Sequence, residues 1–141
     1  MEPDLKELLS FLFQRADATQ TFWNFYIGAV SAVLGLVTAG KPNWLNVWVR
    51  SVITAAFLVF AAANFVALDS VCTLREELMM VASKMKGYTQ IAKVVEAVKP
   101  PAKYVLRGFH GALDVAVVIA IWGIPFARRR YELTSRSKGH G

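Results

Sequence analysis

A run of 23 residues without a charged side chain, from Ala18 to Gly40, constrains the fold of this chain more than any other feature. About 20 apolar residues cross the hydrocarbon core of a bilayer as a helix, so this run is long enough to span it with some tilt. Two further apolar segments follow, and a hydrophobic fraction of 55% suits a multi-span membrane protein better than a soluble domain. We therefore predict an all-α integral membrane protein with a single membrane domain.

Three transmembrane helices are predicted, at 19–39, 46–68 and 108–126, and an interfacial helix is predicted at 1–17. The short Lys41–Asn43 connection contains a proline, which predicts a turn and an antiparallel hairpin of the first two spans. Gly123-Ile124-Pro125 interrupts the end of the third span. We expect this span to cross the membrane. A re-entrant segment is the alternative, and its support is that it would gather most of the Lys and Arg residues on one side of the membrane.

Small and polar residues form one stripe on the first span. They recur at steps of three and four positions, at Asn24, Gly28, Ser31, Gly35 and Thr38. Small residues let helix backbones approach each other, and polar side chains can form hydrogen bonds between helices. The stripe therefore predicts a helix-packing surface. Either the second span uses it, through the small residues Ala55, Ala56 and Ala61–Ala63, or a partner helix does.

Polar side chains also mark the spans at other points. Tyr26, near the start of the first span, is expected as an interfacial anchor, and Arg50 is expected to extend its guanidinium to the headgroups. Arg107, His110 and Asp114 share one face at the start of the third span. An acid inside a span is a candidate site, because it is costly unless it is paired or hydrated. The alternative is an acid near the interface, screened by its two basic neighbours.

The segment after the second span carries a seven-residue apolar repeat. Its members are Val71, Leu74, Leu78, Val81, Met85, Tyr88, Ala92 and Val95. This spacing predicts an amphipathic helical extension of the second span over 70–98, in which Gly87 weakens the helix without ending it. Sustained spacing of this kind, with charged neighbours, is typical of a coiled-coil seam. An amphipathic helix lying on the membrane surface is the alternative.

Chemistry-bearing motifs are few. The two histidines, His110 and His140, are far apart in sequence and Cys72 is the one cysteine, so neither a metal site nor a cofactor is expected. The tail at 128–141 begins with Arg128, Arg129 and Arg130. Beside a span, such a cluster predicts an anchor on anionic lipid headgroups, and nucleic acid is not an expected partner.

The function predicted from these features is non-enzymatic. The two packing surfaces favour an assembly, scaffold or accessory subunit that forms a homo-oligomer or joins a larger membrane complex, with the bacterial cytoplasmic membrane as the expected location. The alternative is an oligomeric pore or permeability protein, holin-like by analogy in size, number of spans and basic tail. Its lumen would be lined by the polar stripe or by Arg107, His110 and Asp114. An enzyme is disfavoured, because no catalytic constellation can be assembled from the sequence.

Overall fold

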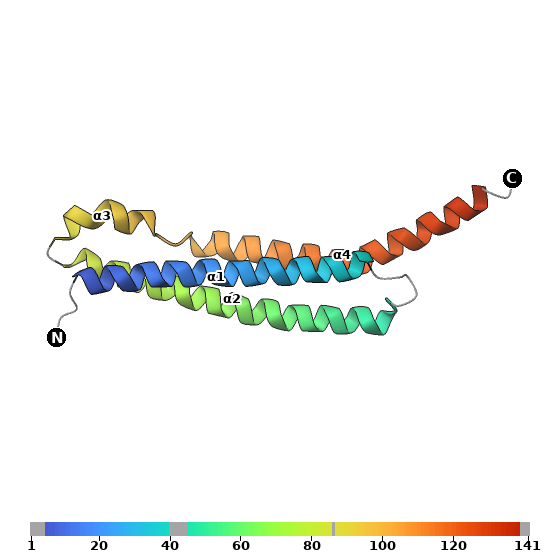
Figure 1. Ribbon diagram of the computed structural model, residues 1–141, viewed down its shortest axis with the longest axis horizontal. Coiled ribbons are helices and arrows are strands. Elements are labelled where there is room, and N and C mark those ends of the chain that lie inside the picture. The colour runs from blue at the N-terminus through green and yellow to red at the C-terminus, as the bar shows by residue number, and fades with distance from the viewer. Residues whose placement is uncertain (1–4, 40–44, 86, 139–141) are drawn as a thin grey trace. The chain divides into compact units, whose positions relative to one another are not determined.

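The computed structural model describes residues 5–39, 45–85 and 87–138, except for the side chains of 129 and 132–138. This part of the chain contains no strand and folds into four helices, α1 (Leu5–Ala39), α2 (Val47–Ser83), α3 (Tyr88–Ala97) and α4 (Lys103–Lys138) (Figure 1). Three of them are long and apolar enough to cross a membrane: α1, α2 and the Lys103–Arg128 part of α4. The all-α prediction is confirmed, and the three helices are compatible with an integral membrane protein.

Two of the helices extend beyond the predicted spans. α1 is a single helix of 35 residues that includes both the segment expected at the interface and the first span. α4 continues through Pro125, so the chain does not turn back there as the re-entrant alternative requires. Proline removes one backbone hydrogen bond, whereas a reversal inside hydrocarbon would leave several backbone groups without partners.

The extension after the second span is not one helix. α2 does continue from the span into it, after a start at which the Asn46 Oδ1 accepts the Val49 N–H at 2.9 Å. It then ends at Ser83, and Gly87 adopts a left-handed backbone with φ of 87° before α3 begins. A glycine takes this conformation at little cost and in it cannot continue a helix. The prediction of an unbroken helix over 70–98 is therefore wrong.

The chain divides into two compact units. Unit 1 comprises Met1–Phe25 and Ala63–Arg107, and unit 2 comprises Tyr26–Ala62 and Gly108–Gly141. α1 and α2, with 35 and 37 residues, are about 50–55 Å long at about 1.5 Å per residue, which exceeds a hydrocarbon core of about 30 Å. In a bilayer, helices of this length would extend beyond the core, and the charged residues indicate which part would do so.

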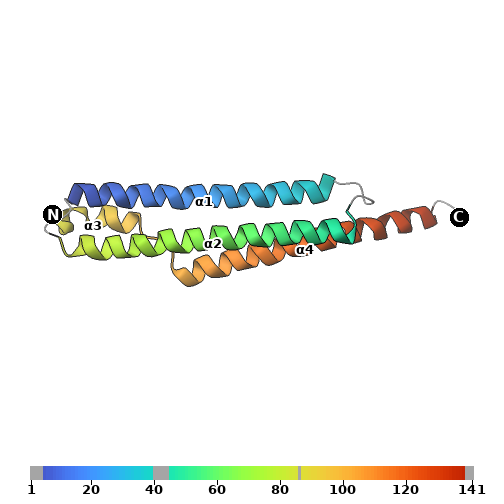
Figure 2. The same ribbon diagram turned by 90° about the horizontal axis from the view of Figure 1, so that it is seen from below.

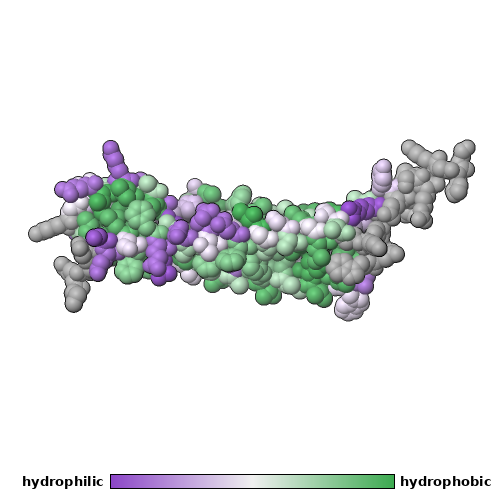
Figure 3. All heavy atoms as spheres, in the orientation of Figure 1, coloured by the Kyte–Doolittle hydropathy of each residue, from purple (hydrophilic) through white to green (hydrophobic). Residues whose placement is uncertain are grey.

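Unit 1 is a bundle with a charged exterior. α3 lies beside the first turns of α1 and the last turns of α2 (Figure 1; Figure 2). The buried residues of this unit include Leu8, Leu12, Thr19, Leu68, Cys72, Arg75, Ala82, Val95 and Leu106. In Figure 3 hydrophilic side chains gather over the first turns of α4 and around the edges of an apolar patch over α3. In the first turns of α1, Leu8 and Leu12 therefore pack against protein, whereas Phe11 and Phe13 are exposed.

Unit 2 differs from unit 1 in having few charged residues among its described positions up to Ala127. Its exposed surface carries large apolar side chains, among them Ile27, Leu36, Val52, Leu58, Val59, Val115, Ile119 and Phe126. Up to Ala127, Arg50 and Asp114 are the Asp, Glu, Lys or Arg residues among its described positions. The buried positions include Tyr26, Phe57, His110 and Ile121. An apolar exterior around a core with polar groups suits a lipid environment.

Candidate functional site

Three polar side chains meet inside unit 2. The Tyr26 hydroxyl donates to Asp114 Oδ1 at 2.7 Å, and His110 Nδ1 lies 3.0 Å from Asp114 Oδ2. The Tyr26 and His110 rings are in contact, with centroids 4.3 Å apart. We call this group, Tyr26, His110 and Asp114, the Tyr–His–Asp cluster.

The local sequence explains the arrangement. His110 and Asp114 are four positions apart on α4, so their side chains lie one turn apart on the same face. Tyr26 comes from α1, and Phe57 of α2 contacts its ring at 6.5 Å between centroids. Tyr26 is fully buried and His110 is 2% exposed, whereas 23% of the Asp114 side chain remains accessible. The cluster therefore connects α1 with α4 and is accessible from outside through its carboxylate.

The side chains of the Tyr–His–Asp cluster can form hydrogen bonds and hold a proton. An ionised carboxylate accepts hydrogen bonds through both oxygens, and here each oxygen has its own protein donor if His110 carries a proton on Nδ1. In a low-dielectric surrounding such hydrogen bonds are strong, and losing one partner leaves a costly buried group. The described residues hold no set of three His, Cys, Asp or Glu side chains close enough for a metal ion. The cluster therefore acts first as a specific link between two helices.

The structure brings together two of the three polar residues predicted for this segment. His110 and Asp114 are in contact, but Arg107 pairs with Asp69, at 3.4 Å between Arg107 Nη2 and Asp69 Oδ1. The expectation that Tyr26 is an interfacial anchor is wrong, because its ring is buried. A signal for this was present in the sequence: a phenol inside an uncharged run needs an acceptor, and Asp114 is the one acid between Arg107 and Arg128.

Arg50 forms a second polar contact in unit 2. Its Nε donates to the Leu45 carbonyl at 2.8 Å, and its guanidinium carbon lies 6.0 Å from the centre of the Trp122 ring. The Trp122 indole N–H donates to the Thr54 hydroxyl at 3.2 Å. Arg50 is buried, so the expected extension to the headgroups is wrong. The carbonyl just before α2 offers a nearby acceptor, and the Trp122 ring covers the charge.

Outward-facing residues make up the predicted stripe on the first span. Asn24, Gly28, Ser31, Gly35 and Thr38 are all exposed. A Cβ atom built on Gly28 or on Gly35 would meet no atom within 4 Å. The alternative in which the second span packs on this stripe is therefore wrong. The buried face of α1 is the opposite one, which carries Tyr26 and Val37. We call these five residues the α1 stripe.

The predicted extension seam is displaced by about one residue on α2. Leu74 and Val81 are exposed and Val71, Leu78 and Met85 are half-buried, whereas the buried positions are Leu68, Cys72, Arg75 and Ala82. On α3 the pattern holds better, since Val95 is buried and Tyr88 is half-buried. A repeat of apolar residues does not include Arg75, although Arg75 is one of the buried positions of α2.

Arg75 is the polar centre of unit 1. It is 5% exposed, and its Nη1 donates to the Thr19 hydroxyl at 3.2 Å. Its Nη2 donates to the Val98 carbonyl at the end of α3. Thr19 in turn donates to the Arg15 carbonyl at 3.0 Å. One guanidinium thus connects α1, α2 and the carboxyl end of α3, where backbone carbonyls lack helical partners.

The basic cluster after the third span is partly described. Arg128 and Arg130 are exposed, and the Arg130 guanidinium lies 5.2 Å from the centre of the Phe126 ring. The Arg129 side chain lies outside the described residues.

Comparisons with protein-family models, with curated proteins and with solved structures find no match to this chain.

Proposed function

We propose that this chain is a small multi-pass membrane protein of the bacterial cytoplasmic membrane that acts without catalysis, as an assembly, scaffold or accessory subunit. Its contact with the partner is the α1 stripe, on which a second membrane helix packs. That helix belongs to another copy of the chain or to a larger membrane complex. The single observation that carries this proposal is the exposure of all five stripe residues.

The α1 stripe is better suited to a helix than to lipid. Open space beside Gly28 and Gly35 would let a partner backbone approach closely. Asn24 places an amide on this face, where its Oδ1 accepts from Gln20 Nε2 at a long 3.3 Å. A partner helix could provide stronger hydrogen bonds to this amide than lipid, which offers none.

The Tyr–His–Asp cluster supports the proposal indirectly. At about 100° per residue, Tyr26 lies on nearly the opposite side of α1 from Gly28, Ser31 and Gly35. A hydrogen bond of 2.7 Å from Tyr26 to Asp114 fixes the rotation of α1 about its own axis. With this rotation fixed, the stripe faces outward as a preformed surface, so binding does not have to order it.

The decisive experiment places bulky side chains on the α1 stripe. Gly28→Leu together with Gly35→Leu should reduce the oligomer, or remove the co-purifying partner, after gentle solubilisation in a mild detergent. Light scattering coupled to size exclusion measures the oligomer, and mass spectrometry identifies the partner. Ala55→Leu with Ala62→Leu is the matched control, because these exposed α2 residues have the same seven-residue spacing. Unchanged assembly in the glycine variant, or an equal loss in the control, would contradict the proposal.

A pore or permeability protein is the alternative function. In unit 2 both Asp114 oxygens have protein contacts, to the Tyr26 hydroxyl and to His110 Nδ1, so the α1 stripe is the better candidate for a polar lumen. Membrane depolarisation on expression, abolished by Asp114→Asn or by the double glycine variant, would favour the pore. No ion leak at high expression would favour the assembly role.

The basic tail is proposed to hold the end of α4 at anionic headgroups through Arg128, Arg129 and Arg130. A ring contact such as that between Arg130 and Phe126 keeps a guanidinium beside an aromatic residue suited to the membrane interface. Substitution of the three arginines by glutamine should weaken the salt-sensitive binding of anionic vesicles to the purified protein.

A further inference from the structure

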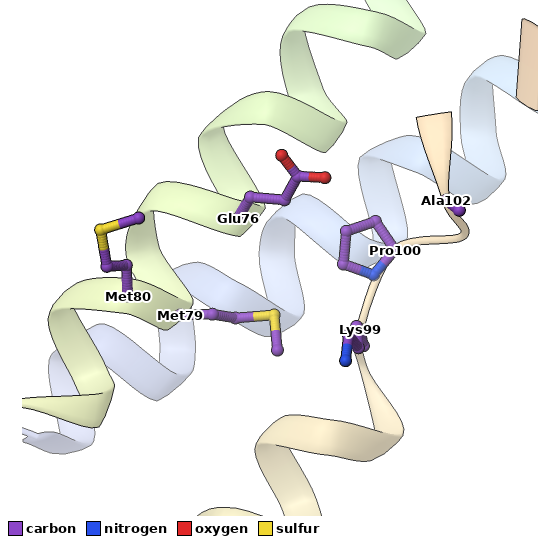
Figure 4. Close-up of a pocket in the computed structure, with 6 residues that line it drawn as sticks. All are labelled: Glu76, Met79, Met80, Lys99, Pro100 and Ala102. Atoms are coloured by element: carbon purple, nitrogen blue, oxygen red, sulfur yellow. The ribbon is translucent and has the colours of Figure 1, made fainter. Parts of the chain in front are cut away.

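A pocket of about 390 Å³ lies in unit 1, between α2 and the segment that connects α3 with α4. It is lined by Glu76, Met79, Met80, Lys99, Pro100 and Ala102. In Figure 4 the side chains of Glu76 and Met79 project from α2 toward the connecting segment that carries Lys99 and Pro100. We call it the connector pocket. Its position has no role in the assembly function proposed above.

The charges around the connector pocket are balanced. Glu76 pairs with Lys103 at 3.0 Å, and Glu96 pairs with Lys99 at 3.0 Å. All four side chains are at least about a third exposed, and exposed pairs of this kind contribute little and exchange readily for other partners. A simple anion would be attracted by two lysines and opposed by two glutamates. A ligand that carries one positive and one negative group matches this arrangement better.

The remaining lining is apolar. Met79, Met80, Pro100 and Ala102 provide a flexible hydrocarbon and thioether wall. Met80, in the lining, is largely exposed, and Tyr104, one residue beyond Lys103 on α4, is largely exposed as well. An exposed tyrosine beside a lysine is typical of the headgroup level of a membrane. The ligand should therefore combine a zwitterionic group with apolar chains.

We propose that the connector pocket binds the headgroup of phosphatidylethanolamine. Its phosphate lies at Lys99 and Lys103, its primary ammonium at Glu76, and the start of its acyl chains against Met79 and Met80. A primary ammonium donates charge-assisted hydrogen bonds to a carboxylate, whereas the quaternary ammonium of choline has no N–H and is held by aromatic rings. The six described lining residues include no aromatic ring, so the pocket favours ethanolamine over choline.

The test uses the purified full-length chain in neutral detergent, with bound lipid counted by native mass spectrometry. The wild-type protein is titrated with phosphatidylethanolamine, its mono- and dimethyl derivatives and phosphatidylcholine, all with the same acyl chains. Affinity should fall as N–H donors are removed, by about tenfold over the series. Equal affinity for all four lipids would overturn the proposal, and this measurement needs no variant that could misfold.

Two matched pairs of variants locate the site. Glu76→Gln should lower the affinity for phosphatidylethanolamine to that for phosphatidylcholine, whereas Glu77→Gln, on an exposed neighbour outside the pocket, should not. Lys99→Gln should weaken both lipids, whereas Lys93→Gln should weaken neither. The competing explanation is a site for simple anions, and phosphatidylglycerol tests it. If the Glu76→Gln variant binds phosphatidylglycerol more tightly than the wild-type protein binds phosphatidylethanolamine, the pocket is an anion site and the proposal is wrong. Equal effects of Glu76→Gln and Glu77→Gln would also overturn it.

Discussion

The two units differ in how many charged residues they carry and in where these lie. Unit 1 keeps its ion pairs at the surface, at Asp69–Arg107, Glu76–Lys103 and Glu96–Lys99, and buries one guanidinium among neutral acceptors. Unit 2 exposes apolar side chains and places Tyr26, His110 and Asp114 inside. In water an exposed ion pair costs little and contributes little, whereas in hydrocarbon a polar group requires a protein partner. The difference indicates which surface suits lipid.

The largest difference between the units is expected when one acid is removed from each. Asp114→Ala should destabilise the protein by about 3 kcal/mol, because it leaves the Tyr26 hydroxyl and the His110 N–H buried without their acceptor. Asp69→Ala, which breaks an exposed pair, should cost less than about 1 kcal/mol. Unfolding of both variants in mixed detergent micelles measures the difference. Equal losses would contradict the contrast between the two units.

The second prediction concerns Arg75. Replacing it by methionine keeps an apolar stem in the core and removes the donor to the Val98 carbonyl. Amide hydrogen exchange in α3 should then accelerate by about tenfold, which corresponds to about 1.4 kcal/mol of local stability. Exchange in the unit 2 part of α4 should not change. Lys93→Met serves as the control, since it makes a similar substitution on the exposed face of α3.

A third comparison uses one glycine from each unit, with effects of opposite sign. Gly87→Ala should destabilise unit 1 by about 1 kcal/mol, because alanine is strained at a φ of 87° although its Cβ would have an ordinary 3.6 Å contact with Leu5. Gly108→Ala lies inside α4 with open space around it and should stabilise by about 0.5–1 kcal/mol. Thermal unfolding of both variants checks the signs, and a stabilised Gly87→Ala would refute the role of the left-handed turn.

The smallest effects are expected for single hydrogen bonds and surface pairs. Thr54→Val removes the acceptor of the Trp122 indole in unit 2 and should cost about 0.6 kcal/mol, the usual size for such bonds between membrane helices. Glu96→Gln breaks an exposed pair on unit 1 and should cost about 0.3 kcal/mol. Chemical denaturation of the two variants side by side would show whether this order is reversed.

Much of the helical architecture could be predicted from the sequence. The uncharged run and the proline pair at Pro100 and Pro101 place the long helices, because hydrophobic length and helix-breaking residues act locally. The predicted turn at Lys41–Asn43 lies outside the described residues. The contact between His110 and Asp114 also follows from their spacing on one helix. The ends of helices were less predictable. Gly87 lies in the break between α2 and α3, whereas Pro125 lies inside α4, although both residue types disfavour a helix interior.

The partners across helices could not be derived in this way. The uncharged run around Tyr26 indicates that its hydroxyl needs an acceptor, but local spacing does not bring it to Asp114, 88 positions away. The buried face of α2 lies about one residue from the hydrophobic repeat because Arg75 finds the Thr19 hydroxyl and the Val98 carbonyl inside unit 1. Burial of a charge depends on acceptors supplied by other helices, which a periodicity within one helix does not contain.

By itself, the sequence determined that the chain is helical and that three of its helices are long and apolar enough to cross a membrane, since these properties depend on residues adjacent along the chain. Only the tertiary structure decided which face of each helix is buried. In the tertiary structure the α1 stripe is exposed, Tyr26 is buried and Arg50 donates a hydrogen bond to the Leu45 carbonyl. The physical reason is that a helix can rotate about its axis at little local cost. Its rotation is set by hydrogen bonds and packing with other helices, as between Tyr26 and Asp114.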